Sequence, residues 1–158
     1  SDGYVTEVTE NDFDKDETYY YKMEYKNGYL QRVEQRYSYN ESRVRVSECT
    51  WRDGNLVEYT AKDYNEDDTE IETAKISYSK TATPINIDLL YFSGYVPVDV
   101  YPLDLLGFCG RQSAKLPDKV DVVWGSESDS DDLGVYTLND DGTVARIDGG
   151  SWSYELIY

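Results

Sequence analysis

Histidine is absent from this 158-residue chain. Without an imidazole, the chain lacks the commonest general base, the Ser-His and Cys-His nucleophile pairs and the commonest metal ligand. The sequence also has no glycine-rich loop for phosphates and no dinucleotide-binding fingerprint. We therefore predict that the protein is not an enzyme, with no catalytic residue and no cofactor.

Positive charge is scarce as well. Lysine and arginine number 15 against 32 aspartates and glutamates, which gives a net charge of -17. Because phosphate contacts are made by cations, this balance argues against nucleic acid as a partner. With 32 carboxylates, pairs arise at any spacing by chance, so no acid pair of the glycosidase kind stands out. A glycan-active enzyme that works through carboxylates alone stays open as an alternative.

Long apolar runs are missing too. No stretch approaches the ~18 apolar residues of a transmembrane helix. The longest apolar stretch, residues 89–100, is broken by two polar residues, a glycine and a proline. The chain also opens at Ser1 without a methionine or a signal pattern, so we expect that a signal, with any lipid anchor, has been removed. We predict a protein that does not span a membrane.

Cysteine occurs twice, at Cys49 and Cys109, and one pair sets no disulfide framework. Cys49 alternates with Trp51 in a strand-like run, which is typical of a small buried apolar residue. Whether Cys49 and Cys109 form a disulfide stays open, because sequence does not place their Cα atoms within bonding range.

Tyrosine is abundant, with 17 tyrosines against 3 phenylalanines and 1 methionine. In residues 18–26 the tyrosines alternate with polar residues, which indicates a half-buried strand. The same pattern predicts about ten strands in an antiparallel meander, with a bulge between Ile71 and Ala74. The expected strands are residues 18–26, 29–39, 43–51, 55–63, 69–79, 120–124, 134–138, 144–147 and 152–158.

Turn glycines recur between these strands, at Gly3, Gly28, Gly54 and Gly142. Three follow aspartate and one follows asparagine, and such dipeptides favour tight hairpins because both residues accept positive φ. The recurrence predicts a single β-domain, residues 1–158, built from degenerate hairpin repeats and strongly curved or barrel-like. The alternative is that these dipeptides recur in any β protein.

Residues 89–116 interrupt the strand pattern. They hold the densest apolar cluster in the chain, and Pro97 and Pro102 exclude a long helix. We predict an insertion of loop and short helical turn that packs its leucines on the concave face of the sheet. A ligand lid is the alternative, since long loops often carry function.

Several short motifs, taken in order, resemble domain-of-unknown-function family 4595. They are residues 25–30 and 51–57, Pro84-Ile85-Asn86-Ile87-Asp88, Leu105-Leu106-Gly107, Cys109-Gly110 and Lys115-Leu116-Pro117. The resemblance covers residues 18–158. It implies the porin-like fold of Bacteroidetes secreted proteins and lipoproteins, and a secreted, periplasmic or outer-membrane-anchored location. It implies no reaction and no catalytic residues.

Two acidic segments suggest weak cation sites. Asp12, Asp14 and Asp16 alternate like the opening of an EF-hand loop. The pattern then fails, because Glu17 replaces the turn glycine and Met23 the bidentate glutamate. For residues 125–132 we predict an acidic, mobile loop tip.

Aromatic side chains supply the remaining candidate surface. Flat rings flanked by carboxylates and amides suit a glycan or a peptide, although tyrosines also pair across strands to stabilise sheets. We therefore expect a module that binds a glycan, peptide or protein partner, with a structural module of a surface assembly as a further alternative. The oligomeric state stays open. The candidate ligand surface comprises Tyr91, Tyr95, Tyr101, Trp51 and Trp124.

Overall fold

The structure is a computed structural model that describes residues 3–66, 68–82, 95–98, 100, 103, 108–149 and 153–157. Every regular element in these ranges is a strand. The prediction of an all-β chain with about ten strands is confirmed. The strands are β1 (Glu7–Asp12), β2 (Glu17–Lys26), β3 (Tyr29–Tyr37), β4 (Asn40–Arg52), β5 (Asn55–Asn65), β6 (Asp68–Ala82), β7 (Lys115–Trp124), β8 (Glu127–Asp132), β9 (Val135–Leu138), β10 (Val144–Asp148) and β11 (Ser153–Glu155).

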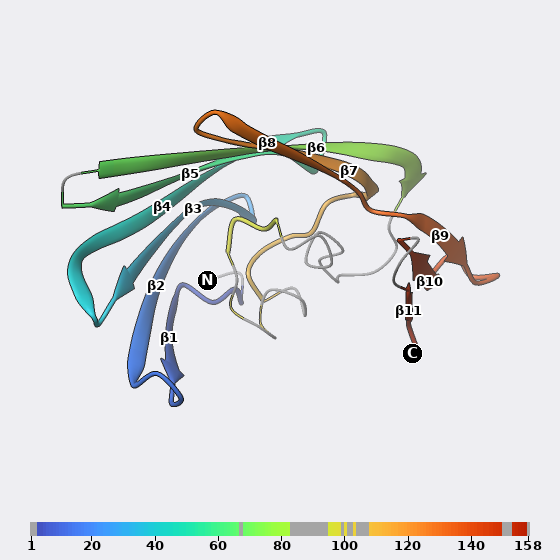
Figure 1. Ribbon diagram of the computed structural model, residues 1–158. Helices are drawn as coiled ribbons and strands as arrows, with labels where there is room; N and C mark the ends of the chain where they lie inside the picture. The colour runs from blue at the N-terminus through green and yellow to red at the C-terminus, as the bar shows by residue number, and fades with distance from the viewer. Residues whose placement is uncertain are drawn as a thin grey trace.

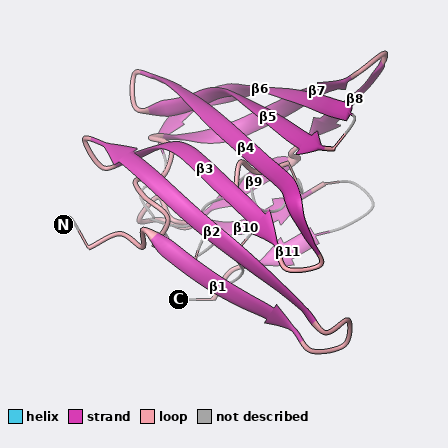
Figure 2. Cartoon of the chain, turned by 90° about the vertical axis from the view of Figure 1, so that its left-hand side faces the viewer, coloured by secondary structure: helices cyan, strands magenta, loops and turns pink. Residues whose placement is uncertain are grey.

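Strands β1 to β8 form one antiparallel sheet in sequence order, as predicted for a meander. The sheet is strongly curved and arches over residues 95–98 and 108–114 (Figure 1). Its long central strands, β2 to β6, run side by side across the molecule (Figure 2). Among the described strands, β1 and β8 are the two edges and do not pair with each other, so the sheet is open. Within the same ranges, no helix has the length and apolar content needed to cross a bilayer.

The last three strands form a separate small sheet in the order β11-β10-β9, which corrects the prediction of a single meander. The chain leaves the large sheet at Gly134, whose φ of +86° belongs to the left-handed region. A side chain at Gly134 would collide with the carbonyl of Asp148, so glycine alone permits this close approach. The small sheet packs Val144 and Ile147 against Leu116 at the start of β7. Division into domains stays a prediction.

Tight hairpins join the central strands, as the turn dipeptides predicted. Asn27 and Gly28 have φ of 54° and 81°, and Asp53 and Gly54 have φ of 50° and 76°. Two left-handed residues in succession match the right-handed twist of the flanking strands. The segment 111–114, just before β7, fastens both turns: the amide of Arg111 donates to the Gly28 carbonyl over 2.8 Å, and Ala114 donates to the Gly54 carbonyl over 2.9 Å. We call residues 111–114 the fastening segment.

Two apolar clusters fill the concave side of the large sheet. One lies over β5, β6 and β7, around Tyr59, Ala74 and Val122. The other joins β2 and β3 to Val98, Val100 and Cys109. The described part of the predicted insertion therefore packs on the concave face. It contains no helix in residues 95–98, 100, 103 and 108–114; the rest of the insertion lies outside the described residues.

Two local predictions are wrong, and one strand was not predicted. Strands β5 and β6 pair without a register shift from Glu58↔Lys75 to Asn65↔Asp68, so there is no bulge between Ile71 and Ala74. Ile71 is half exposed because it alternates with the residues that point inward. The predicted acidic loop at residues 125–132 is largely strand β8, which pairs with β7 from Lys119↔Asp132 to Trp124↔Glu127. Strand β1 was not expected at all.

The two cysteines are thiols in this structure. Cys109 is buried in the cluster over β2 and β3, and Cys49 packs against the same cluster. Cys49 is half-buried, so the burial predicted for it is only partial, while its contact with the cluster agrees with the predicted apolar role.

Candidate functional site

A deep cavity of about 430 Å³ opens on the concave face of the large sheet. Inward side chains of β1 to β6 form its floor and walls, and the loop residues 95–98 close one side. Because side chains alternate along a strand, inward positions of neighbouring strands meet at one surface. Tyr21, Val33, Ser47 and Tyr59 in this lining are all buried.

A second, larger cavity of about 950 Å³ continues from the first. It lies toward the end of the sheet formed by the β5–β6 and β7–β8 turns and is lined by mostly exposed side chains. Arg45, Glu72 and Tyr95 line both cavities. The two cavities therefore form one continuous groove that is deep at one end and shallow at the other. We call it the concave groove.

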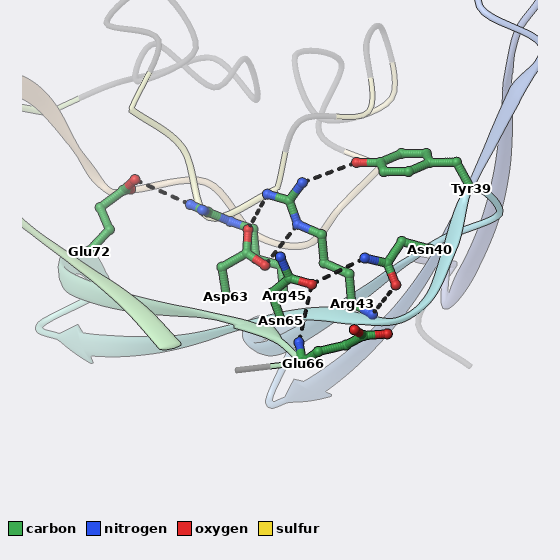
Figure 3. A network of polar contacts seen from close by, with 8 residues as sticks. All are labelled: Tyr39, Asn40, Arg43, Arg45, Asp63, Asn65, Glu66 and Glu72. Atoms are coloured by element: carbon green, nitrogen blue, oxygen red, sulfur yellow. Dashed lines mark hydrogen bonds and ion pairs between the residues drawn. The ribbon is translucent and has the colours of Figure 1, made fainter. Parts of the chain in front are cut away.

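An ion pair lies at the junction of the two cavities. Arg45 on β4 donates to Glu72 on β6 across the intervening strand β5, with 3.3 Å between Nη2 and Oε2 (Figure 3). Tyr59 on β5 donates its hydroxyl to the other carboxylate oxygen of Glu72 over 2.7 Å. Burial and the negative charge of Glu72 raise the pKa of Tyr59 well above its usual value. The phenol therefore stays protonated and holds Glu72 in place as a donor.

A second ion pair joins β4 to β5 near the start of β4. Arg43 binds Asp63 through two parallel hydrogen bonds, 3.0 Å from Nε and 2.6 Å from Nη2 (Figure 3). The guanidinium also lies over the ring of Tyr37, 4.8 Å from its centroid, and donates to the hydroxyl of Tyr39. The hydrogen bonds to Asp63 raise the pKa of Arg43 further above its usual value. Such a two-bond pair is geometrically fixed, so it stabilises the sheet beside the concave groove.

Aromatic and acidic side chains form the rim of the shallow end. Tyr95 donates its hydroxyl to Asp129 on β8 over 2.9 Å, and Trp124 donates its indole N–H to Glu127 over 3.1 Å. The hydrogen bond to Asp129 raises the pKa of Tyr95. The amide of Ser130 and the hydroxyl of Tyr95 lower the pKa of Asp129 in turn. These contacts fix the hydroxyl of Tyr95 and the indole N–H of Trp124 at the rim.

The structure describes three of the five aromatic residues that sequence analysis grouped, and it separates one of these from the other two. Tyr95 and Trp124 lie together at the shallow end. Trp51 does not join them: its indole N–H donates to the Leu30 carbonyl over 2.6 Å, and its ring packs on Tyr29, 4.7 Å away. These contacts are packing contacts, and a role of Trp51 in ligand binding stays a prediction. Tyr91 and Tyr101 lie outside the described residues.

The weak cation candidates lie at the β1–β2 turn. Asp12 accepts hydrogen bonds from the amides of Asp14 and Lys15 and pairs with the Lys15 ammonium over 3.2 Å. These contacts, the ammonium first, lower the pKa of Asp12. Among the described residues, no group of three or more histidine, cysteine, aspartate or glutamate side chains is placed to hold a metal ion. Cation binding by Asp12, Asp14 and Asp16 stays a prediction.

Sequence analysis missed the polar residues of the groove, chiefly Arg45, Ser47 and Glu72. In β4 the sequence alternates Val44 and Val46 with Arg45 and Ser47, so the valines were the natural choice for the inward face. In the structure the polar residues point inward. The signal that could have found them is register with the next strand: Ser47 pairs with Ala61, which shares its face with Tyr59.

No model of a protein family matches this chain, and no curated protein is similar to it in sequence. Solved structures do match it. A porin-like protein from Bacteroides vulgatus superimposes with a TM-score of 0.69 over 93% of this chain at 16% identity. A porin-like protein from Bacteroides uniformis superimposes with a TM-score of 0.59 over 96% of this chain at 17% identity.

At these identities the likeness shows a shared fold. The expectation of a porin-like fold, with structural neighbours from Bacteroides, is confirmed at that level, and membership of family 4595 stays a prediction. This chain spans 67% of the length of the first neighbour and 62% of the second, so the neighbours carry structure beyond the part that matches.

Proposed function

We propose that this protein is a non-enzymatic binding domain that holds a glycan chain in the concave groove. The observation that carries the proposal is the groove itself, where aromatic rings meet carboxylates, an amide and a guanidinium. Tyrosine and tryptophan offer flat apolar faces with a polar edge, and carboxylates are strong acceptors for hydroxyl groups. Cavities of roughly 300–1,000 Å³ with a few placed polar groups are the usual form of ligand sites.

A glycan fits this groove better than an extended peptide does. Strands β4, β5 and β6 under the groove lie between neighbouring strands, so their backbone groups are already paired. A peptide that binds by adding a strand needs a free sheet edge, which the groove floor lacks. Recognition in the groove therefore depends on side chains. The side chains that line the groove are suited to binding the hydroxyl groups of a glycan.

We also propose that the protein acts outside the cytoplasm, secreted or held in the cell envelope, and that it is related to family 4595. The porin-like neighbours from Bacteroides support this location. Fractionation of the cells that make the protein is expected to recover it in the envelope or the medium. Recovery in the cytoplasm would contradict this location.

The proposal predicts that glycan binding depends on the ring of Trp124. Purified protein is expected to bind at least one oligosaccharide on a glycan array, and calorimetry with that oligosaccharide then measures the dissociation constant. Trp124→Ala is expected to weaken binding roughly tenfold, since an aromatic contact contributes about 1–1.5 kcal/mol beyond its buried area. Phe13→Ala is the matched control, because Phe13 is 90% exposed on the β1–β2 turn and lines neither cavity.

Two outcomes would contradict the proposal. If no glycan binds on the array, the structural-module alternative gains support. If the protein releases reducing sugar from a polysaccharide and Glu72→Gln abolishes that release, the protein is a carboxylate-based enzyme. We expect no release, because both carboxylate oxygens of Glu72 already accept hydrogen bonds, one from Arg45 and one from Tyr59.

A further inference from the structure

A buried hydroxyl in the deep cavity lacks a partner. Ser47 lines this cavity and is 2% exposed. Its hydroxyl makes no hydrogen bond to any part of the chain that the structure describes. A buried hydroxyl without a partner costs stability, so proteins seldom keep one unless something fills the space beside it. Ser47 lies between Val33 and Ala61 on the neighbouring strands, so a smaller apolar residue would fit the sheet at lower cost.

Two more groups in the same cavity have unused hydrogen-bonding capacity. Arg45 has five N–H donors and directs one of them, on Nη2, to Glu72; within the described residues the others have no partner. Gln35 donates its amide N–H to Tyr21, while no described residue donates to its carbonyl oxygen. The cavity therefore presents a donor group, an acceptor group and a hydroxyl that can act as either.

The shape of the concave groove indicates which part of a ligand reaches these groups. Apart from the exposed Glu10, buried and half-buried side chains line the deep cavity, whereas mostly exposed residues near the β5–β6 and β7–β8 turns line the shallow cavity. The deep cavity, about 430 Å³, has less than half the volume of the shallow one, about 950 Å³, and residues 95–98 close one side of it. A glycan chain that continued toward residues 95–98 would meet the buried Val98 and Pro97.

We propose that the deep cavity binds the terminal monosaccharide of a neutral glycan, with Ser47, Arg45 and Gln35 as the groups that recognise its hydroxyls. The following sugars lie in the shallow cavity against Tyr95 and Trp124. This inference rests on the proposed function and adds the position and chemical class of the sugar that is recognised.

The charges around the cavity favour a neutral sugar. Glu10 and Glu72 line it and would repel a uronic acid or a sulfated sugar. Arg45 is already paired with Glu72, whereas Glu10 has no ion pair among the described residues, so the lining keeps an excess of negative charge. A ring of hydroxyls satisfies donors and acceptors together without adding charge.

Free monosaccharides test the inference on the full chain. The panel is glucose, galactose, mannose, xylose, fucose and N-acetylglucosamine, with glucuronic acid as the charged comparator. Binding is measured by ligand-observed NMR and by competition with the array oligosaccharide. At least one neutral monosaccharide is expected to compete, and glucuronic acid is expected to bind at least tenfold more weakly. Ser47→Ala is expected to weaken that binding roughly three- to tenfold, the usual effect of losing one hydrogen bond. Ser47→Val is expected to abolish it, because two methyl groups fill the floor.

Thermal unfolding distinguishes a loss of ligand binding in these variants from a loss of folding. Ser47→Ala is expected to melt at or above the wild-type temperature, because the hydroxyl it removes is unpaired within the chain. Ser128→Ala is the matched control: Ser128 is exposed on β8 and lines neither cavity. An unchanged affinity of Ser47→Ala for the monosaccharide would overturn the inference while the proposed function stands. So would a glycan that binds without competition from any monosaccharide, which is the result expected if the deep cavity holds only water. Binding of peptides but of no glycan would overturn both.

Discussion

Charged and polar side chains that point inward from a sheet need partners, because burial removes them from water. Asp63 is buried and has Arg43, and Glu72 has both Arg45 and Tyr59. Asp131 on β8 differs. Burial, followed by the charges of Asp129 and Asp132, raises its pKa above the usual value. At neutral pH the folded sheet therefore carries a carboxylate whose charge opposes folding.

Asp131→Asn should stabilise the protein at pH 7. A raised folded-state pKa means that the charged form is disfavoured by folding, so the cost is present above that pKa and disappears below the unfolded value of 3.8. The melting temperature is expected to rise by roughly 1–3 °C at pH 7, and the difference should vanish as the pH falls below about 3.8. Circular dichroism melts from pH 3 to pH 7 measure both.

The matched control for this change is Asp132→Asn, which removes the same charge one residue along β8 at an exposed position. It should have a smaller effect. An equal rise in both variants would assign the gain to net charge alone, and a lower melting temperature in Asp131→Asn at pH 7 would contradict the argument.

At the level of elements, Gly134 determines where the large sheet ends. Its left-handed φ and the nearby Asp148 carbonyl admit no side chain. Gly134→Ala is expected to lower the free energy of unfolding by about 2–4 kcal/mol, since it adds a steric clash to backbone strain. Urea denaturation measures the change.

Gly142 provides the control, because its φ of +87° is almost the same and no atom lies within 4 Å of the position of a Cβ. Gly142→Ala should cost only the backbone term, about 1 kcal/mol. Equal costs in the two variants would show that the contact with Asp148 has no role.

The sequence predicts a strand well when local pattern and turn residues stabilise it, and poorly when pairing with a distant strand does. Strands β2 to β5 alternate apolar and polar residues around Asn27-Gly28 and Asp53-Gly54, so local pattern and turn chemistry are enough. Strand β8, with the sequence ESDSDD, has no apolar residue and is extended because it pairs with β7. No local pattern contains that information. The concave groove was missed for the related reason that Arg45 and Glu72 are brought together across β5.

At the scale of the whole molecule, the net charge of -17 opposes the compact state. Raising the ionic strength from about 0.01 M to 0.15 M shortens the Debye length from roughly 30 Å to 8 Å, which screens this repulsion. The melting temperature at pH 7 is therefore expected to rise by a few degrees over this range of sodium chloride. Choline chloride at equal ionic strength should raise the melting temperature by the same amount. A fall in the melting temperature would show that attractive ion pairs outweigh the repulsion.

The fastening segment also bears on the order in which the chain folds. Hairpins β2–β3 and β4–β5 close through neighbouring residues, whereas Ser113 reaches Leu56 across 57 positions and the Lys115 amide reaches Asn55 across 60. Closing so long a loop costs more entropy than closing a hairpin, so we expect the hairpins to form early and the fastening segment to dock late. Contacts made after the rate-limiting step slow unfolding and leave the folding rate almost unchanged. Residues 111–114 thus govern how long the arched sheet lasts once formed.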